Sequence, residues 1–255
     1  MWHVRANRDL VSTCGRDGVI GFWDLRADSA IQKIEAAHMI GPSKARNRHI
    51  LSAPSVTSIA WLRHGYQALA SSCHGNSCIK LWDTRSFSSL KPKAIDESPL
   101  NTSSRDFGIN SLVTSSDGKY LYSLCRDNKI YAYSPAQVSE GPVHTYSDPR
   151  LMTRTFFVKI SASRDCQYIA AGSSENAPVL FPVSDNDGQA TTSGTALVRG
   201  HQKEVTSLTW TSTSSLVTAS DDFTIRKWSE RPELAYRLQE DGEGEGRRWG
   251  HGWAE

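Results

Sequence analysis

The sequence predicts an all-β fold, and three observations lead to this prediction. Five times along the 255 residues, an acidic or amide residue is followed six positions later by an aromatic one. These aromatics lie 59, 51, 48 and 47 residues apart, and each pair follows a short apolar run that ends in small residues. Residues 205–210 alternate apolar and polar side chains, as a half-buried strand does. The five pairs are Asp17 and Trp23, Asn76 and Trp82, Asp127 and Tyr133, Glu175 and Phe181, and Asp222 and Trp228.

The last repeat shows the expected unit most clearly. A Gly-His pair at 200–201 precedes strands expected at 205–210, 216–220 and 224–228, and residues 234–238 can supply a fourth, outer strand. A repeated unit of four antiparallel strands is the blade of a β-propeller. A repeat of roughly 40–45 residues with Gly-His near its start and Trp-Asp near its end is the WD-repeat form.

Five repeats of this kind can be placed along the chain, and they are expected near 1–36, 37–95, 106–146, 155–198 and 199–238. The first repeat begins inside an inner strand, so we expect it to be partial. Because propellers close by pairing their first and last blades, we expect the chain to be a fragment of a seven-bladed ring, with a five-bladed ring as the alternative.

The strands of the other repeats follow the same rule of short apolar runs. They are expected at 10–14, 19–23, 30–34, 56–61, 68–72, 109–114, 120–125, 129–133, 156–160, 168–172 and 178–181. Residues 39–54, with Pro, Ser and basic side chains, are expected to form a mobile loop, and residues 184–196 a flexible one. Residues 239–255 are expected to form a disordered tail.

Four side chains of the last repeat are expected to form one buried polar network. His201 can reach a hydroxyl on the second strand, either Thr218 or Ser220, and the turn carboxylate Asp222, while the hydroxyl can accept from the indole of Trp228. Buried polar groups need such partners. The set resembles a hydrolase triad, but within one blade its role is structural, so no catalytic residue is expected.

Composition excludes several classes of protein. A net charge of +2 gives no electrostatic argument for sequence-independent DNA binding, and the chain has no apolar run long enough to cross a membrane. Five cysteines suit free thiols in a reducing compartment. Cys73, His74 and Cys78 lack a fourth ligand for zinc, so no metal or other cofactor is expected.

Two local motifs point to a binding function. Both have the form Trp-Asp-x-Arg, in adjacent blades, so their guanidinium groups should emerge on one face. Arginine offers a rigid fork of donors to carboxylates and backbone carbonyls of a partner. The alternative is an arginine that is solvated or bound within its own blade. The candidate residues are Trp23, Asp24 and Arg26, and Trp82, Asp83 and Arg85.

The chain resembles the denticleless family of WD-repeat proteins, and fungal members most of all. The stretches 156–175, 200–210 and 219–228 look like the last two blades of that family. The insertion after His38 is similar to an insertion in the family, and residues 252–254 resemble a short motif beyond its propeller. Phe181 departs from the pattern, because the family has tryptophan there.

This resemblance implies a non-catalytic substrate receptor of a cullin-4 RING ubiquitin ligase, acting in the nucleus. The two Trp-Asp-x-Arg motifs then bind the ligase adaptor, a damaged-DNA-binding protein, and the receptor presents replication and cell-cycle substrates docked on the sliding clamp. No membrane or direct nucleic-acid contact is implied.

Three other classes remain open from the residues alone. The first is a generic WD-repeat scaffold for protein assembly. The second is an enzyme with ionisable groups at the channel mouth. The third is a nucleic-acid binder that uses the short basic run at 44–49.

Overall fold

The computed structural model describes residues 3–7, 9–39, 54–62, 68–85, 93–99, 107–183, 192–197, 200–230 and 253–254. In these ranges the chain forms twenty strands and one short 3-10 helix, η1 (Val138–Glu140), and no α-helix. The strands make five antiparallel sheets of four strands each. The all-β prediction is confirmed.

Within every sheet the strands follow one another in chain order, so each pairs with the next through a turn or a loop. The first sheet holds β1 (His3–Asn7), β2 (Leu10–Cys14), β3 (Ile20–Asp24) and β4 (Ala30–Ile34). The second holds β5 (Val56–Trp61), β6 (Ala68–Cys73), β7 (Ile79–Asp83) and β8 (Asp96–Glu97). The third holds β9 (Ile109–Thr114), β10 (Leu121–Cys125), β11 (Lys129–Tyr133) and β12 (Pro142–Ser147). The fourth holds β13 (Ile160–Ala162), β14 (Tyr168–Ala171), β15 (Val179–Pro182) and β16 (Thr195–Ala196), and the fifth β17 (Val205–Ser212), β18 (Ser215–Ser220), β19 (Ile225–Glu230) and β20 (Trp253–Ala254).

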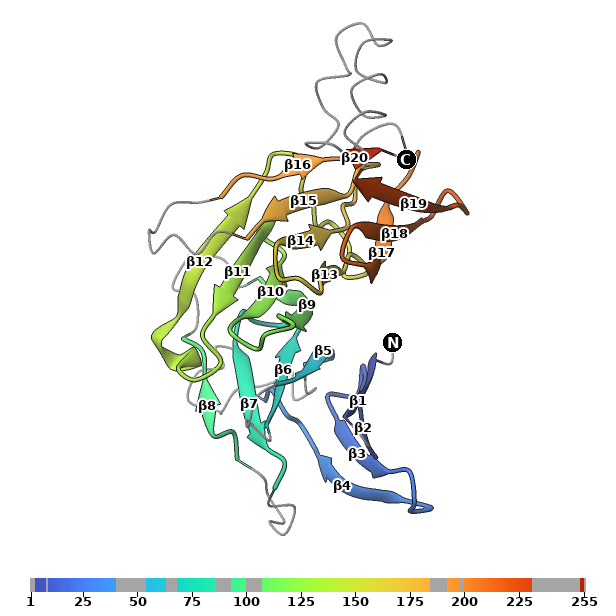
Figure 1. Ribbon diagram of the computed structural model, residues 1–255. Helices are drawn as coiled ribbons and strands as arrows, with labels where there is room; N and C mark the ends of the chain where they lie inside the picture. Colours follow the sequence, from blue (N-terminus) through green and yellow to red (C-terminus); the bar gives the residue numbers. More distant parts are fainter. Residues whose placement is uncertain are drawn as a thin grey trace, which may run out of the picture.

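The five sheets follow one another around an arc, as Figure 1 shows. The first strand of each sheet contacts the first strand of the next, which places β1, β5, β9, β13 and β17 on the inner side. In the part of the chain that the structure describes, no strand of the first sheet pairs with a strand of the fifth. This is the architecture of part of a β-propeller.

Apolar clusters lie between neighbouring sheets. Phe22 of the first sheet and Trp61 of the second meet edge to face, with ring centroids 6.2 Å apart. Tyr146 of the third sheet and Phe181 of the fourth are 6.0 Å apart in the same geometry. Trp228 of the fifth sheet lies in a cluster with residues of the fourth. Each sheet is thus held by burial against its neighbours, so the sheets form one continuous core.

Two expectations about strands are corrected. The first repeat was expected to be partial, but its sheet has four strands, because β1 extends to Asn7 and pairs with β2 along its whole length. A strand was expected at 156–160, but β13 starts only at Ile160. The backbone of Thr155 and Phe156 is instead held by side chains, since Asn110 donates to the carbonyl of Thr155 and Lys159 to that of Phe156.

The outer strands differ most from expectation. Strand β8 lies beyond residue 95, β16 lies inside the loop expected at 184–196, and β20 lies inside the tail expected to be disordered. Backbone pairing of Ser229 with Ala254 and of Glu230 with Trp253 makes β20 the fourth strand of the fifth sheet. Residues 40–53 of the insertion and residues 234–238 lie outside the described residues.

Replacing Phe22 with alanine should lower the free energy of unfolding by about 3–5 kcal/mol, because it empties a fully buried site between two sheets. The shift of the denaturation midpoint in guanidinium measures this. Ile31→Ala, at an exposed position of β4 in the same sheet, serves as the control and should change the midpoint little. Equal shifts for both variants would contradict the proposed role of the interface.

Candidate functional site

The first Trp-Asp-x-Arg motif closes on itself at the end of β3. Nε of Arg26 donates to Oδ1 of Asp24 at 2.9 Å, and Nη2 donates to Oδ2 at 2.8 Å. The backbone N–H of Arg26 also donates to Oδ1 at 2.9 Å. This two-pronged pairing fixes the plane of the guanidinium group, and the arginine side chain remains 75% exposed.

The second motif repeats this geometry at the end of β7. Arg85 donates to Asp83 through Nε and Nη2, both at 3.0 Å, and through its backbone N–H at 2.8 Å. Its side chain is 68% exposed. Hydrogen bonds from Arg26 lower the pKa of Asp24 to about 2, and those from Arg85 lower the pKa of Asp83. Both carboxylates are therefore ionised near neutral pH.

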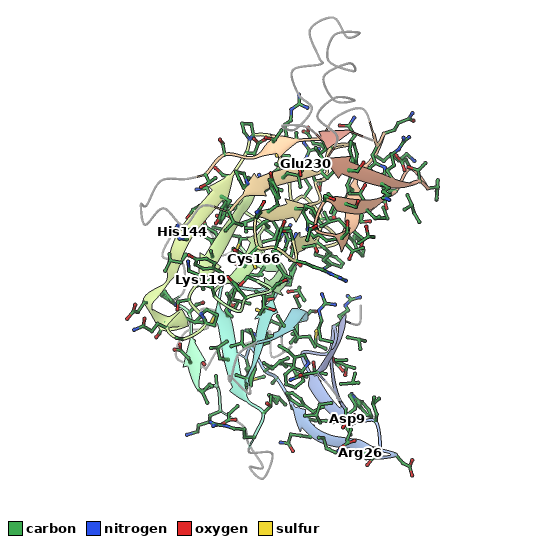
Figure 2. The ribbon with its side chains drawn as sticks, viewed as in Figure 1. Asp9, Arg26, Lys119, His144, Cys166 and Glu230 are labelled. Atoms are coloured by element: carbon green, nitrogen blue, oxygen red, sulfur yellow. The ribbon has the colours of Figure 1, made fainter. Side chains whose placement is uncertain are left out.

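We call these two pairs the Asp–Arg clamps. They follow the third strands of two adjacent sheets, so they lie on the same face of the arc (Figure 1). Arg26 lies beside Asp9 of the β1–β2 hairpin at one end of the first sheet (Figure 2). Sequence reasoning placed both arginines on one face. The alternative, an arginine that is solvated or bound within its own blade, describes both arginines here: the aspartate of each motif binds one edge of the guanidinium, and the side chain stays mostly exposed.

The two tryptophans of the motifs differ in burial. The indole of Trp23 donates to Thr13 at 3.0 Å, and that of Trp82 donates to Ser71 at 2.8 Å. Trp82 is buried against residues of the first sheet, whereas Trp23 is 38% exposed. Each indole therefore anchors its third strand to the second strand of the same sheet, and Trp82 also holds two sheets together.

A chain of hydrogen bonds crosses the last sheet. Nε1 of Trp228 lies 2.9 Å from Oγ1 of Thr218, which lies 2.7 Å from Nε2 of His201, and Nδ1 of His201 lies 3.1 Å from Oδ2 of Asp222. A carboxylate can only accept, so Nδ1 of His201 carries a proton and donates to Asp222. In the neutral tautomer, Nε2 then accepts from the hydroxyl of Thr218, whose oxygen also accepts from the indole of Trp228. Burial lowers the pKa of His201, which favours that neutral form.

Asp222 and Ser220 complete the turn that holds this chain. Asp222 accepts from the backbone N–H groups of Gln202 and Thr224, each at 2.9 Å. Ser220 was the alternative hydroxyl for His201, but the structure places it elsewhere. Its Oγ donates to the carbonyl of Lys203 and accepts from the N–H of Asp222. Thr218, and not Ser220, is therefore the hydroxyl that contacts Nε2 of the histidine.

The second repeat contains the same series of hydrogen bonds from tryptophan to histidine, but it has no final bond from the histidine to a carboxylate among the described residues. The indole of Trp82 donates to Ser71, whose Oγ lies 2.9 Å from Nε2 of His38. Asn76 stands where the last repeat has Asp222, and its Oδ1 accepts from the thiol of Cys73 and the N–H of Cys78. Nδ1 of His38 is buried without a hydrogen-bond partner among the described residues. Burial lowers the pKa of His38 to about 3.

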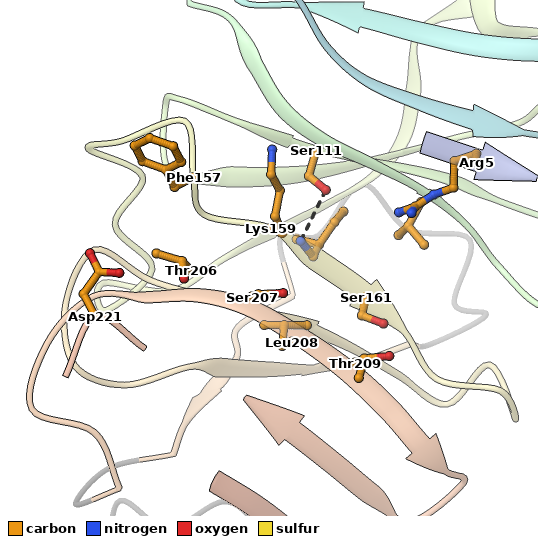
Figure 3. A pocket seen from close by; sticks show the side chains of 12 residues that line it. Arg5, Ser111, Phe157, Lys159, Ser161, Thr206, Ser207, Leu208, Thr209 and Asp221 are labelled. Carbon is orange, nitrogen blue, oxygen red and sulfur yellow. Dashed lines mark hydrogen bonds between the residues drawn. The ribbon is translucent and has the colours of Figure 1, made fainter. Parts of the chain in front are cut away.

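A cavity of about 790 Å³ lies on the inner side of the arc, and its titratable lining residues are Arg5, Lys159 and Asp221 (Figure 3). Lys159 donates to the carbonyls of Asn110 and Phe156 at 2.8 and 3.1 Å. Burial lowers the pKa of Lys159 to about 8. Its ammonium group thus holds backbone in place, which is a structural contact.

Other candidate chemistry can be placed briefly. All five cysteines are free thiols, and four of them are buried. Among the residues described here, no three His, Cys, Asp or Glu side chains gather as a metal site would require. The described ranges also contain no helix with the length and apolar character needed to span a membrane.

Comparisons with known proteins place the chain among WD-repeat proteins. The family model "WD domain, G-beta repeat" matches residues 45–83 and 193–229. The cell division cycle protein cdt2 of Schizosaccharomyces pombe is 37% identical over 87% of this chain and 45% of its own length. The protein lethal(2)denticleless of Drosophila melanogaster is 31% identical over 90% of this chain and 32% of its own length. The human denticleless protein homolog is 30% identical over 85% of this chain and 32% of its own length. The chain thus spans less than half the length of these relatives.

Replacing Thr218 with valine should destabilise the last sheet by about 1–3 kcal/mol, because the buried indole of Trp228 loses its hydrogen bond to the Thr218 hydroxyl. Chemical denaturation followed by tryptophan fluorescence measures the change. Thr211→Val, at an exposed position of β17 in the same sheet, is the matched control. A destabilisation no larger than that of the control would show that the hydrogen-bond chain contributes little.

The free energy of unfolding should fall as the pH is lowered from about 6.5 towards 3. Folding lowers the pKa of His38 to about 3, so the unfolded chain binds a proton in this window that the folded chain does not. One such group contributes a slope of about 1.4 kcal/mol per pH unit. Urea denaturation at several pH values should show this slope reduced in His38→Gln. An unchanged slope in that variant would contradict the assignment.

Proposed function

Because the chain belongs to the denticleless family of WD-repeat proteins, we propose that it is a substrate receptor of a cullin-4 RING ubiquitin ligase. The proposal has three parts. The Asp–Arg clamps bind the ligase adaptor, a damaged-DNA-binding protein. The receptor presents replication and cell-cycle substrates that are docked on the sliding clamp. The complex acts in the nucleus.

The observation that carries this proposal is the repetition of one geometry in two adjacent sheets. Both clamps follow a third strand, both pair Nε and Nη2 with an aspartate, and both leave the arginine mostly exposed. A single exposed arginine is common on a surface and needs no explanation. Two identical ones on one face make a spaced pair of donors that a partner surface can match.

The clamps also reduce the cost of binding. A free arginine side chain loses much rotamer freedom when a partner immobilises it. In both motifs the aspartate already holds the guanidinium plane, so less freedom remains to be lost. The free edge of each guanidinium can donate to carbonyl or carboxylate oxygens of the adaptor.

The receptor itself performs no chemical step in this proposal. It raises the effective concentration of substrate lysines near the conjugating enzyme of the ligase, which accelerates transfer without a catalytic residue in this chain. Lys159 of the inner cavity fits this non-catalytic role, since its ammonium group already donates to two backbone carbonyls.

Replacing Arg26 and Arg85 together with alanine, in the full-length protein, should abolish co-precipitation of the adaptor. The variant removes both exposed forks but no buried contact, so the fold should persist, as circular dichroism and the melting temperature can verify. Substrate should then accumulate through S phase. Replacing both arginines with lysine should also weaken capture, because an ammonium group cannot form the two-pronged pair.

Arg126→Ala provides the matched control. Arg126 is exposed in the turn between β10 and β11, at the opposite end of the strands from the clamps, and its loss should leave adaptor capture intact. Undiminished capture by the double alanine variant would refute the adaptor-binding role. The chain would then fit the generic class of WD-repeat scaffolds.

A further inference from the structure

We propose that the face opposite the Asp–Arg clamps binds a short acidic peptide segment of a partner protein. Phe156 and Phe157 would contact an apolar side chain of that segment, and Arg16 would pair with a carboxylate next to it. The proposal rests on a different surface from the adaptor site and does not depend on the proposed function.

The position of this surface follows from the strands. Arg16 lies in the turn that precedes β3, and Arg26 follows the end of β3. His74 lies in the turn that precedes β7, and Arg85 follows the end of β7. Arg16 and His74 therefore lie at the opposite ends of the same strands from the clamps. A partner bound near them leaves the clamps accessible.

Phe156 and Phe157 expose two large aromatic rings side by side. They are 40% and 44% exposed, and their ring centroids lie 4.3 Å apart. Isolated exposed apolar residues are ordinary, but adjacent aromatic rings on one spot form the kind of patch that partners bind. The core does not explain these rings, since they lie before β13 rather than within it.

The backbone under the two rings is fixed by polar contacts on several sides. Asn110, a buried residue, donates to the carbonyl of Thr155 at 2.8 Å. Lys159 donates to the carbonyl of Phe156 at 3.1 Å, and the hydroxyl of Thr155 donates to Glu204 at 2.7 Å. A segment held in this way presents its side chains with little ordering cost on binding.

A cavity of about 560 Å³ lies between the two rings and the turns that carry Arg16 and His74. Its walls are tied together, because the hydroxyl of Ser55 donates to the carbonyl of Arg16 and the N–H of His74 donates to the carbonyl of Ser55. The carbonyl of His74 also packs so closely on Gly108 that a Cβ there would lie 2.0 Å from it. The cavity is therefore part of the rigid structure.

The charge of the lining selects the partner. Among the residues that the structure describes, Arg16 and His74 are the titratable residues of the cavity wall, and no carboxylate lines it; the other lining residues are Ser55, Val56, Thr57, Phe156 and Phe157. One arginine fork matches one carboxylate, whereas phosphate recognition in proteins uses clusters of arginines. The cavity holds a few side chains and no folded domain. The occupant is thus an extended segment with one apolar side chain and a nearby aspartate or glutamate.

A selection from a random library of nine-residue peptides displayed on phage tests this proposal. The bait is the full chain, and a parallel selection uses the double variant Phe156→Ser with Phe157→Ser. Peptides that combine an apolar residue with an acidic one should be enriched on the wild-type chain alone. Equal enrichment on both baits, enrichment of basic peptides, or no enrichment would overturn the proposal.

Fluorescence anisotropy with one selected peptide then assigns the contacts. The double serine variant should weaken binding about tenfold or more, as loss of an aromatic contact centre does. Arg16→Gln should remove the preference for the acidic peptide over its amide analogue. An undiminished preference in Arg16→Gln would overturn the assignment of the carboxylate contact.

Phe223→Ser is the matched control, because Phe223 is a 95% exposed aromatic in the turn between β18 and β19. It should leave peptide binding unchanged, and an equal loss there would mean unspecific apolar attraction. Circular dichroism and the melting temperature check the fold of each variant. Adaptor capture by the double serine variant should persist, so the two surfaces can fail independently.

Discussion

Each four-stranded sheet in this chain carries apolar residues that are buried against a neighbouring sheet. Strand β6 is buried along all six residues, and β10 along all five. A strand buried on both faces must lie between two layers. The sheets are therefore stable through their neighbours, as Phe22 against Trp61 and Tyr146 against Phe181 illustrate. Because the strands are packed tightly between sheets, the turns at both of their ends are held in place. Both candidate binding surfaces are built from such turns.

Polar side chains inside the sheets follow a second constraint. In the last repeat the indole, hydroxyl, imidazole and carboxylate are joined in one series, so each of these four groups has a hydrogen-bond partner. The second repeat keeps the first three groups and ends at His38, and its asparagine serves the turn instead. The fold therefore tolerates the absence of the bond from histidine to carboxylate where the surrounding sheets already bury the histidine.

The sequence was sufficient for the class of fold and for the second strand of every sheet, because an aromatic every fifty residues or so and short apolar runs have only one common architecture. It was insufficient for the outer strands. Strands β16 and β20 have two residues each and pair through backbone groups, so no side-chain pattern marks them. Residues 156–160 were misassigned because two phenylalanines suggest a strand, whereas contacts from Asn110 and Lys159 hold the first of them in a turn. Sequence also named Arg26 and Arg85 and left open that they bind within their own blades, but it did not identify Asp24 and Asp83 as the residues that hold them.

The pairing of each exposed arginine with its own aspartate has a consequence for the speed and selectivity of recognition. Each clamp is an ion pair with almost no net charge, so its field falls off over a short distance and is screened further by salt. Such a surface does not accelerate the approach of a partner from afar, nor does it attract acidic proteins in general. It discriminates only after contact, by the match between fixed N–H donors and the acceptors placed opposite them. Neutral backbone carbonyls satisfy that requirement as well as carboxylates do, and they are insensitive to the ionic strength of the surroundings.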